Sequence, residues 1–194
     1  MVKRTSTAYS PFFSEKPAES SLDAIADVLD KYPEHLIKTM VDAGTKIRPL
    51  RSRERFHAAS AEMRRRGVNV DVWPVPPAGL FVVNERTLYL RSVTPMTICH
   101  ELGHALDAAL GGGIYHSSSN RAIRAAFREA RRYVTPYAVA GIDEYWAEGQ
   151  RAFLGVNDPG SPWGIATPQL LREYDPNLYA IIEAVFTVPA TAKG

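Results

Sequence analysis

The segment that decides the fold of this chain covers residues 94–113 and reads TPMTICHELGHALDAALGGG. Thr94 followed by Pro95 predicts the start of a helix, because a threonine side chain can cap the first turn and proline suits the first helical position. The glycines at 111–113 predict where this helix ends. Inside it lies His100-Glu101-Leu102-Gly103-His104, which is an HExxH pattern.

The spacing of the two histidines points to a metal site. Residues four apart on a helix project from one face, so His100 and His104 can reach one zinc ion with bonds of about 2.0–2.1 Å. Glu101 lies one position round the helix, where its carboxylate can lie beside a metal-bound water without being a ligand. Another face of the helix is expected to pack in the core, and it carries Cys99, Leu102, Leu106 and Leu110.

Zinc needs a third protein ligand, and a later segment offers two candidates. The longer form of the motif would place a histidine six residues after His104, but Leu110 stands there. The remaining option is a carboxylate, as in sites with two histidines and one glutamate. Glu144 and Glu148 are spaced to share a helix face, where two like charges repel unless a cation lies near them. The residues alone leave open which of the two binds the metal.

This arrangement resembles the metallopeptidase family that includes anthrax lethal factor and the Pro-Pro endopeptidases. That family combines HExxH with a tyrosine seven residues before a glutamate, which two aromatic residues, Ala and Glu follow. Here Tyr137 precedes Glu144 by seven residues, and the chain continues Tyr145-Trp146-Ala147-Glu148. The resemblance covers residues 80–155 and extends beyond them only in general layout. The family includes larger toxins, so a toxin or effector role is among those that the resemblance implies.

The resemblance also implies a role for each of these residues. The ligands of one zinc ion per chain would be His100, His104 and Glu144. Glu101 would be the catalytic glutamate, and Tyr137 would place its hydroxyl near the substrate oxyanion. Glu148 would hold a ligand histidine in one tautomer. Asp107, on the ligand face of the motif helix, is either a similar supporting residue or an ordinary surface aspartate.

The implied reaction is hydrolysis of a peptide bond in a protein or peptide substrate. Zinc lowers the pKa of its water toward about 7, and Glu101 would take the proton as general base. An extended substrate can pair with an edge strand of a sheet. The candidate for that strand is formed by Thr87, Leu88, Tyr89 and Leu90.

The patterns around the motif predict an α+β fold, with a small mixed sheet, the motif helix and a mainly helical C-terminal half; the resemblance makes it zincin-like. Strand patterns cover 46–50, 68–73, 80–83 and 87–90, the last two forming a hairpin. Pro49 restricts the first of them to an edge. Helical patterns cover 21–33, 36–44, 52–66 and 176–186. We expect a flexible arm over 1–20, one metallopeptidase domain over 21–186 and a flexible tail over 187–194.

Composition excludes several other classes of protein. Hydrophobic residues make up 45% and charged residues 23% of the 194 residues, as in ordinary globular proteins. A single cysteine excludes a disulfide framework and a multi-cysteine zinc finger. The sequence shows no membrane-spanning run and no secretory signal. We therefore expect a cytoplasmic protein, or one exported by a non-classical route.

Two other functions remain open from the sequence. The zinc site could be catalytically degenerate, which would make this an interaction protein. Alternatively, a regulatory protease could carry a nucleic-acid-binding surface, because arginines are dense in 53–66 and 121–132. The net charge of +2 and the lack of a recognition motif argue against nucleic acid as a partner. The oligomeric state is not predictable.

Overall fold

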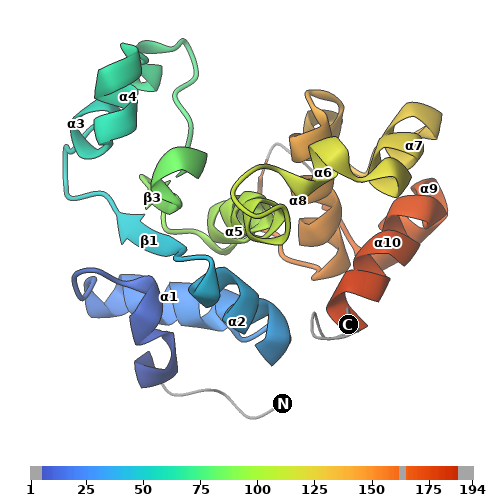
Figure 1. Cartoon of the computed structure of the whole chain (residues 1–194), viewed down its shortest axis with the longest axis horizontal. Helices are drawn as coiled ribbons and strands as arrows, with labels where there is room; N and C mark the ends of the chain where they lie inside the picture. Colours follow the sequence, from blue (N-terminus) through green and yellow to red (C-terminus); the bar gives the residue numbers. More distant parts are fainter. Residues whose placement is uncertain (1–5, 162–164, 188–194) are drawn as a thin grey trace.

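A three-stranded sheet lies beside the motif helix in the computed structural model, which describes residues 6–161 and 165–187 (Figure 1). The strand order is β1-β3-β2, with β1 (Lys46–Pro49) parallel and β2 (Gly79–Val82) antiparallel to the central β3 (Thr87–Leu90). The predicted hairpin is therefore confirmed, with Leu80 opposite Tyr89. Pro49 lies on an edge strand as predicted, since proline has no N–H to donate to a further strand.

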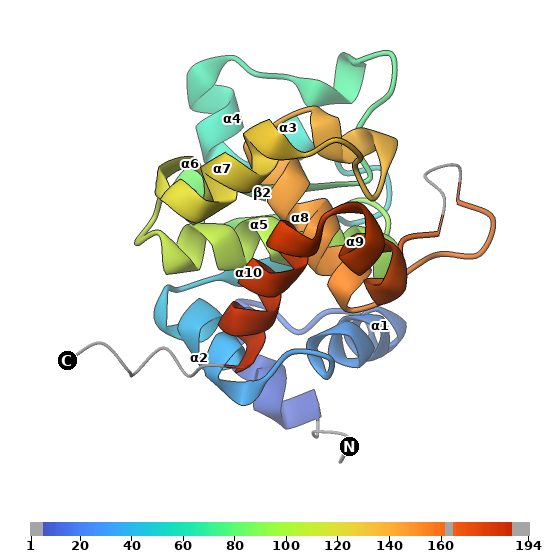
Figure 2. The ribbon, with the colours of Figure 1, turned by 90° about the vertical axis from the view of Figure 1, so that its right-hand side faces the viewer.

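Helices make up most of the remaining structure, and the α+β class predicted from the sequence is confirmed. The N-terminal helices are α1 (Glu19–Leu29) and α2 (Glu34–Asp42), and the motif helix is α5 (Pro95–Leu110). The C-terminal half contains α6 (His116–Ser119), α7 (Arg121–Glu129), α8 (Ile142–Phe153), α9 (Pro168–Tyr174) and α10 (Pro176–Thr187). Figure 2 shows α10 lying across this half, where it contacts α7, α8 and α9.

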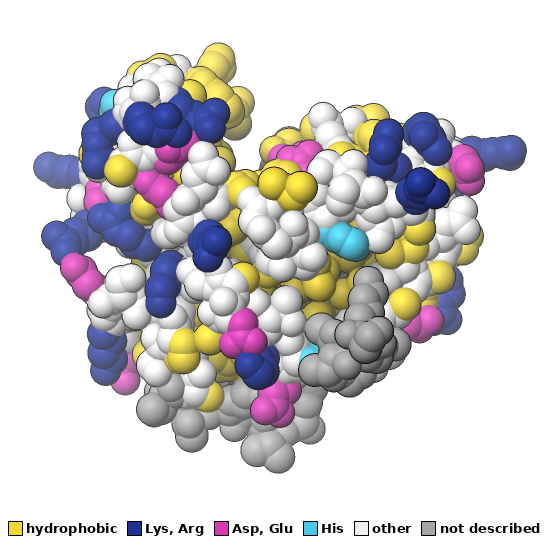
Figure 3. All heavy atoms as spheres, viewed as in Figure 1, with side chains coloured by type: hydrophobic (Ala, Val, Ile, Leu, Met, Phe, Trp, Pro, Cys, Tyr) yellow, Lys and Arg dark blue, Asp and Glu magenta, His cyan; other side chains and the backbone are white. Residues whose placement is uncertain are grey.

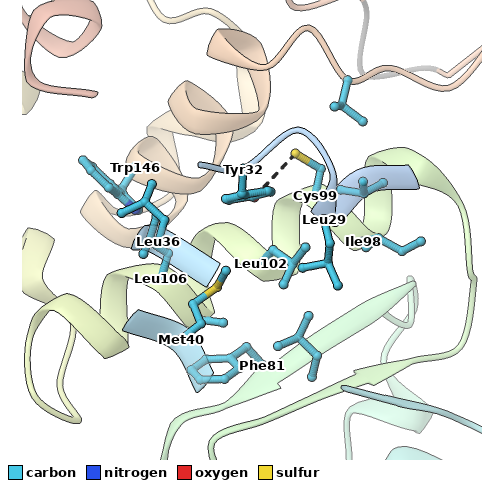
Figure 4. Packing of buried hydrophobic residues seen from close by; sticks show 14 of the residues in the cluster. Leu29, Tyr32, Leu36, Met40, Phe81, Ile98, Cys99, Leu102, Leu106 and Trp146 are labelled. Atoms are coloured by element: carbon cyan, nitrogen blue, oxygen red, sulfur yellow. Dashed lines mark hydrogen bonds between the residues drawn. The ribbon is translucent and has the colours of Figure 1, made fainter. Parts of the chain in front are cut away.

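The main core forms where α5 meets the sheet, α1, α2 and α8. Leu102 and Leu106 of α5 are fully buried, and Figure 4 shows them among side chains from α1, α2 and α8. Ile47, Leu88 and Leu90 belong to the same cluster. The opposite face of the sheet belongs to a second, smaller cluster, which contains Phe56, Met63, Val70, Val82 and Tyr89. The sheet thus joins the α5 side of the molecule to the lobe formed by residues 51–72.

Three sequence predictions in the N-terminal half are wrong. The pattern over 52–66 is not one helix but two, α3 (Phe56–Ala59) and α4 (Ala61–Arg66), because Ser60 breaks the helix and caps α4 by accepting a hydrogen bond from Met63 N. The expected strand at 68–73 is a 3-10 turn, Val70–Val72, capped by Asn69. The arm expected at 1–20 is wrong for its middle part, where Tyr9 and Phe12 belong to the 3-10 helix Ser6–Phe12 and are completely buried.

The tail expected over 187–194 begins one residue too early, since Thr187 ends α10, and the rest lies outside the described residues. None of the helices in the described part of the chain combines the length and apolar character that crossing a membrane requires.

Candidate metal centre

Helix α5 is held in place by its buried side chains, and this fixes the positions of its two histidines. Its first turn is capped as predicted, with Thr94 Oγ1 accepting a hydrogen bond from Thr97 N at 3.4 Å, and Pro95 stands at the first position. Ile98, Cys99 and Leu102 are fully buried behind the helix. The predicted cap and packing face therefore set the rotation of α5, and this rotation turns His100 and His104 to the side that meets α8.

Helix α8 crosses α5 at very short range, because no side chain separates the two backbones. A Cβ added to Gly103 would lie 2.8 Å from Ala147 Cα and 3.0 Å from Ala147 Cβ. Only glycine at 103 with a small residue at 147 allows this approach. The crossing point lies between Glu144 and Glu148, so both carboxylates face the histidines of α5.

Three ligand atoms meet at one point between these helices. His100 Nε2 lies 3.1 Å from Glu144 Oε2, His104 Nε2 lies 3.3 Å from the same oxygen, and the two nitrogens are 3.2 Å apart. Atoms at about 2.0–2.1 Å from a tetrahedral zinc ion are about 3.3 Å from one another. The side chains of these three residues could therefore hold a metal ion without rearrangement.

The chemistry of the donor set also fits a metal. Glu144 Oε2 is buried and has no hydrogen-bond partner within the described residues, although it faces two imidazoles. A buried carboxylate oxygen without a donor is unfavourable unless a cation satisfies it. Two imidazoles and one carboxylate match the ligands of zinc sites with one position open to water.

Glu148 does not contact this point but supports His100 from behind. Its Oε1 lies 2.9 Å from His100 Nδ1, which leaves Nε2 of that ring facing Glu144. Thr135 Oγ1 donates to the other oxygen at 2.5 Å, and the guanidinium of Arg151 donates to both oxygens at 3.1 and 2.9 Å. Arg151 is itself completely buried. A carboxylate that orients a ligand histidine in this way is a common feature of zinc sites.

The charges of the site shift the pKa values of its groups strongly. Burial alone would favour neutral His100, but Glu144 and Glu148 outweigh burial and raise the pKa of His100 to about 10. Burial would likewise raise the pKa of Glu148, but His100 and Arg151 lower it to about 2. Interactions with His100 and His104 hold the pKa of Glu144 well below its usual value against the effect of burial. Both acids are therefore negative at neutral pH and present a cation-binding surface.

Glu101 lies beside the three candidate ligands, under strand β2. It is 6% exposed, and a Cβ on Gly79 would lie 2.7 Å from its Cγ, so glycine at 79 lets the strand approach this side chain. Burial raises the pKa of Glu101, the two histidines lower it in part, and a hydrogen bond from the backbone of Phe81 also lowers it. A carboxylate of raised pKa beside the ligand point is suited to accept and return a proton.

Two tyrosines flank the histidines, and the sequence predicted only one of them. Tyr137 Oη donates to Glu144 Oε1 at 3.2 Å, and its ring lies 5.6 Å from that of His100. Tyr115 was missed, although its ring lies 5.7 Å from that of His104. Burial and nearby carboxylates raise the pKa of both phenols, so both are protonated donors. Because Tyr115 stands 11 residues after the motif in a loop with no periodicity, no sequence signal marked it.

Asp107 is neither a surface residue nor in contact with a ligand. It is fully buried and accepts hydrogen bonds from Ser117 N at 2.7 Å and Ser117 Oγ at 2.5 Å. Burial raises the pKa of Asp107 to about 6 despite these bonds. The contact ties α6 to α5 and so fixes the loop that carries Tyr115.

The strand proposed to receive substrate is assigned wrongly. Residues 87–90 form the central strand of the sheet, so both of their backbone edges are already paired. Among the described residues, no strand pairs with the outer edge of β2, where Gly79 lies against Glu101 and the backbone of Phe81 is hydrogen-bonded to that carboxylate. The error arose because strand order within a sheet depends on tertiary pairing, and β1 joins β3 from a distant part of the chain.

Comparisons with known proteins support the fold. No family model matches the chain, and no curated protein matches it. Among solved structures, the chain is similar to the Pro-Pro endopeptidase PPEP-2 from Paenibacillus alvei, with a TM-score of 0.62 and 18% identity. The match covers 90% of this chain and 97% of that one. This chain has a Pro-Pro-endopeptidase-like fold. At this level of identity the likeness concerns the fold, and the chemistry must be argued from the residues themselves.

Proposed function

We propose that this chain is a zinc-dependent metalloendopeptidase that hydrolyses a peptide bond in a protein substrate. The observation that carries the proposal is the triangle of His100, His104 and Glu144, with sides of 3.1–3.3 Å, and Glu101 beside it. The solved structure with a similar fold is named an endopeptidase, which agrees with this chemistry.

His100, His104 and Glu144 would hold the zinc ion, which lowers the pKa of a bound water and polarises a carbonyl when present. Glu101 takes the proton of the attacking water and passes it to the leaving amine. Tyr137 turns its hydroxyl from Glu144 to the oxyanion that forms on the substrate. Glu148 keeps Nδ1 of His100 engaged, so that Nε2 stays directed at the metal.

The substrate strand in this proposal pairs with the free edge of β2. In the antiparallel ladder with β3, alternate residues turn their backbone groups away from the partner strand. In β2, Ala78 O accepts a hydrogen bond from Arg91 N and so faces β3. Because the direction alternates along the strand, the backbone groups of Gly79 and Phe81 face away from β3. An extended peptide on this edge would lie directly beside Glu101.

A digest of a peptide library, with zinc content measured, tests the proposal. The wild type should contain one zinc ion and cleave a subset of peptides, whereas Glu101→Ala should retain zinc and cleave none. Equal cleavage by both proteins would contradict the role of Glu101. Bound zinc without cleavage by the wild type would instead indicate a degenerate zinc-binding protein.

A companion experiment tests the assignment of the third ligand. Glu144→Ala removes an atom at the ligand point, whereas Glu148→Ala removes a hydrogen bond behind His100. Glu148→Ala should weaken zinc affinity by about 10–100-fold. Glu144→Ala should weaken it further, so this variant should lose more of its zinc during dialysis against a chelator. The reverse order would show that Glu148 is the ligand.

A further inference from the structure

Helix α7 presents a row of arginines to solvent. Arg121, Arg124 and Arg128 share one exposed face of the helix, and the exposed Arg131 follows just after its end; we call these four the α7 arginine ridge. The opposite face of α7 is buried through Ile123 and Ala126. Residues 121–132 contain five arginines and one glutamate, whereas the whole chain carries a net charge of only +2. Positive charge is therefore concentrated here.

The positive charges of the ridge are not paired with carboxylates in the described part of the chain. None of its four arginines forms an ion pair with a residue in the described ranges 6–161 and 165–187, although repulsion between like charges three or four apart disfavours the helix. Arg132, just beyond the ridge, shows the contrast, because it lies 3.8 Å from Glu173 and stacks 3.7 Å over the ring of Tyr174. The ridge thus stays available to a partner of negative charge.

The location of the ridge ties it to the metal centre. Helix α7 contacts α6 and α8, the elements next to Tyr115 and Glu144. The chain then runs from Arg131 into the turn Pro136–Val139, which carries Tyr137. Figure 3 shows Lys and Arg side chains gathered where Figure 1 places α7; other side chains separate them from the hollow that divides this part of the molecule from the lobe of α3 and α4. A chain that lies on the ridge and continues across these side chains would reach the hollow.

The surface suits a polypeptide better than a nucleic acid. Sites for single-stranded nucleic acid interleave cations with aromatic platforms for the bases. On α7 the residues between the arginines are small, Ala122 and Ala125, and Phe127 packs against Tyr133 and Tyr145 instead. The adjoining centre is also rich in carboxylates, which repel phosphodiesters but leave a peptide bond unaffected.

We propose that the α7 arginine ridge binds an acidic segment of the protein substrate and so directs the neighbouring peptide bond to the metal centre. This inference rests on the proposed peptidase function and adds a substrate class to it. The ridge acts on binding rather than on the reacting atoms. Its contribution is therefore expected in KM and in the dependence on ionic strength, not in kcat.

The test uses the full chain carrying Glu101→Ala, so that binding is measured without turnover. The probe is a fluorescent peptide of alternating acidic and small residues, with an Asn/Gln version as the neutral control. The variant is Arg124→Glu with Arg128→Glu. The matched control is Arg53→Glu with Arg55→Glu, which makes the same charge change at two exposed arginines that also lack an ion pair among the described residues.

The acidic peptide should bind more tightly than the neutral one and weaken as salt is raised. The ridge variant should lose at least about tenfold in affinity, while the control pair should stay close to the parent. In proteins with Glu101 intact, adding the acidic segment to a cleaved library peptide should lower KM only when the ridge is intact.

Equal binding by the ridge variant and its parent would overturn the inference, as would an equal loss in the control pair. Tighter, ridge-dependent binding of single-stranded DNA than of the acidic peptide would assign the ridge to nucleic acid instead. Failure of the proposed function would be seen separately: the protein with an intact ridge and an intact Glu101 would then hydrolyse none of the library peptides.

Discussion

Helices α5 and α8 meet at the candidate metal centre, but they hold their polar side chains there in different ways. Behind His100 and His104, α5 buries an apolar face that includes Ile98 and Leu102. Helix α8 also buries polar residues in its C-terminal half, among them Glu148 and Arg151, with exposures of 4% and 0%. Hydrophobic packing holds the back of the first helix, whereas the second adds a network of charges and hydrogen bonds to the packing of its buried Tyr145 and Trp146.

The difference shows where the site is vulnerable. Apolar burial tolerates small changes in geometry, but a buried charge that loses its partner is strongly unfavourable. The α8 side should therefore be more sensitive to single substitutions than the α5 side, apart from the ligands and Glu101 themselves. Four predictions test this comparison.

The largest effect is expected from Arg151→Met. This change leaves the carboxylate of Glu148 buried without the guanidinium that donates to both of its oxygens, which should destabilise the fold by about 3–5 kcal/mol. Urea unfolding measures the loss. Arg172→Met is the control, since Arg172 is 66% exposed and lies 4.0 Å from Glu183, and it should cost less than about 1 kcal/mol. Similar losses for both variants would show that the Glu148 network does not stabilise α8.

Tyr137→Phe tests the turn that leads into α8. Removing the hydroxyl should reduce kcat by about 10²–10³, as for loss of an oxyanion donor, with zinc content unchanged. Tyr115→Phe, next to His104, should reduce kcat by less than about tenfold. If the two effects were exchanged, the donor would come from the α6 side and the role given to Tyr137 would be wrong.

Gly103→Ala tests the contact between the two helices. The added methyl has no room beside Ala147, so the helices must separate, at an expected cost of about 1–3 kcal/mol and with weaker zinc retention. Ala147→Gly in the same protein removes one of the two clashing carbons and should restore part of both losses. Thermal unfolding and zinc content measure the outcome. A Gly103→Ala protein as stable as the wild type would mean that the crossing is looser than the structure shows.

The smallest effect is the pH dependence of stability that protonation of Glu148 causes, which is seen only at acidic pH. Its pKa is lowered from 4.5 to about 2 in the fold, so its stabilising contribution is complete above pH 4.5 and is lost as the pH falls toward 2. Metal-free wild type should therefore lose thermal stability over this range more steeply than metal-free Glu148→Gln. Parallel curves for the two proteins would show that Glu148 does not carry this pH dependence.

The parts of the fold that the sequence predicted are those with strong local signals. Thr94-Pro95 and the glycines after Leu110 placed α5 within one residue, and the hairpin of β2 and β3 followed from alternation. The helix expected over 52–66 failed because Ser60, read as an interior residue, is a cap. The buried Tyr9 and Phe12 were missed because two aromatic residues in a Ser/Thr/Pro-rich segment show no periodicity.

The sequence by itself determined that His100 and His104 would share one face of a capped helix, with Glu101 one position round it, because helix geometry depends only on neighbours along the chain. Only the tertiary structure decided which of Glu144 and Glu148 lies at the candidate ligand point. Both carboxylates face α5. The close contact between Gly103 of α5 and Ala147 of α8 places Glu144 at the ligand point and Glu148 behind His100. The same holds for β3 as the central strand and for Tyr115 beside His104, since both depend on contacts between distant segments.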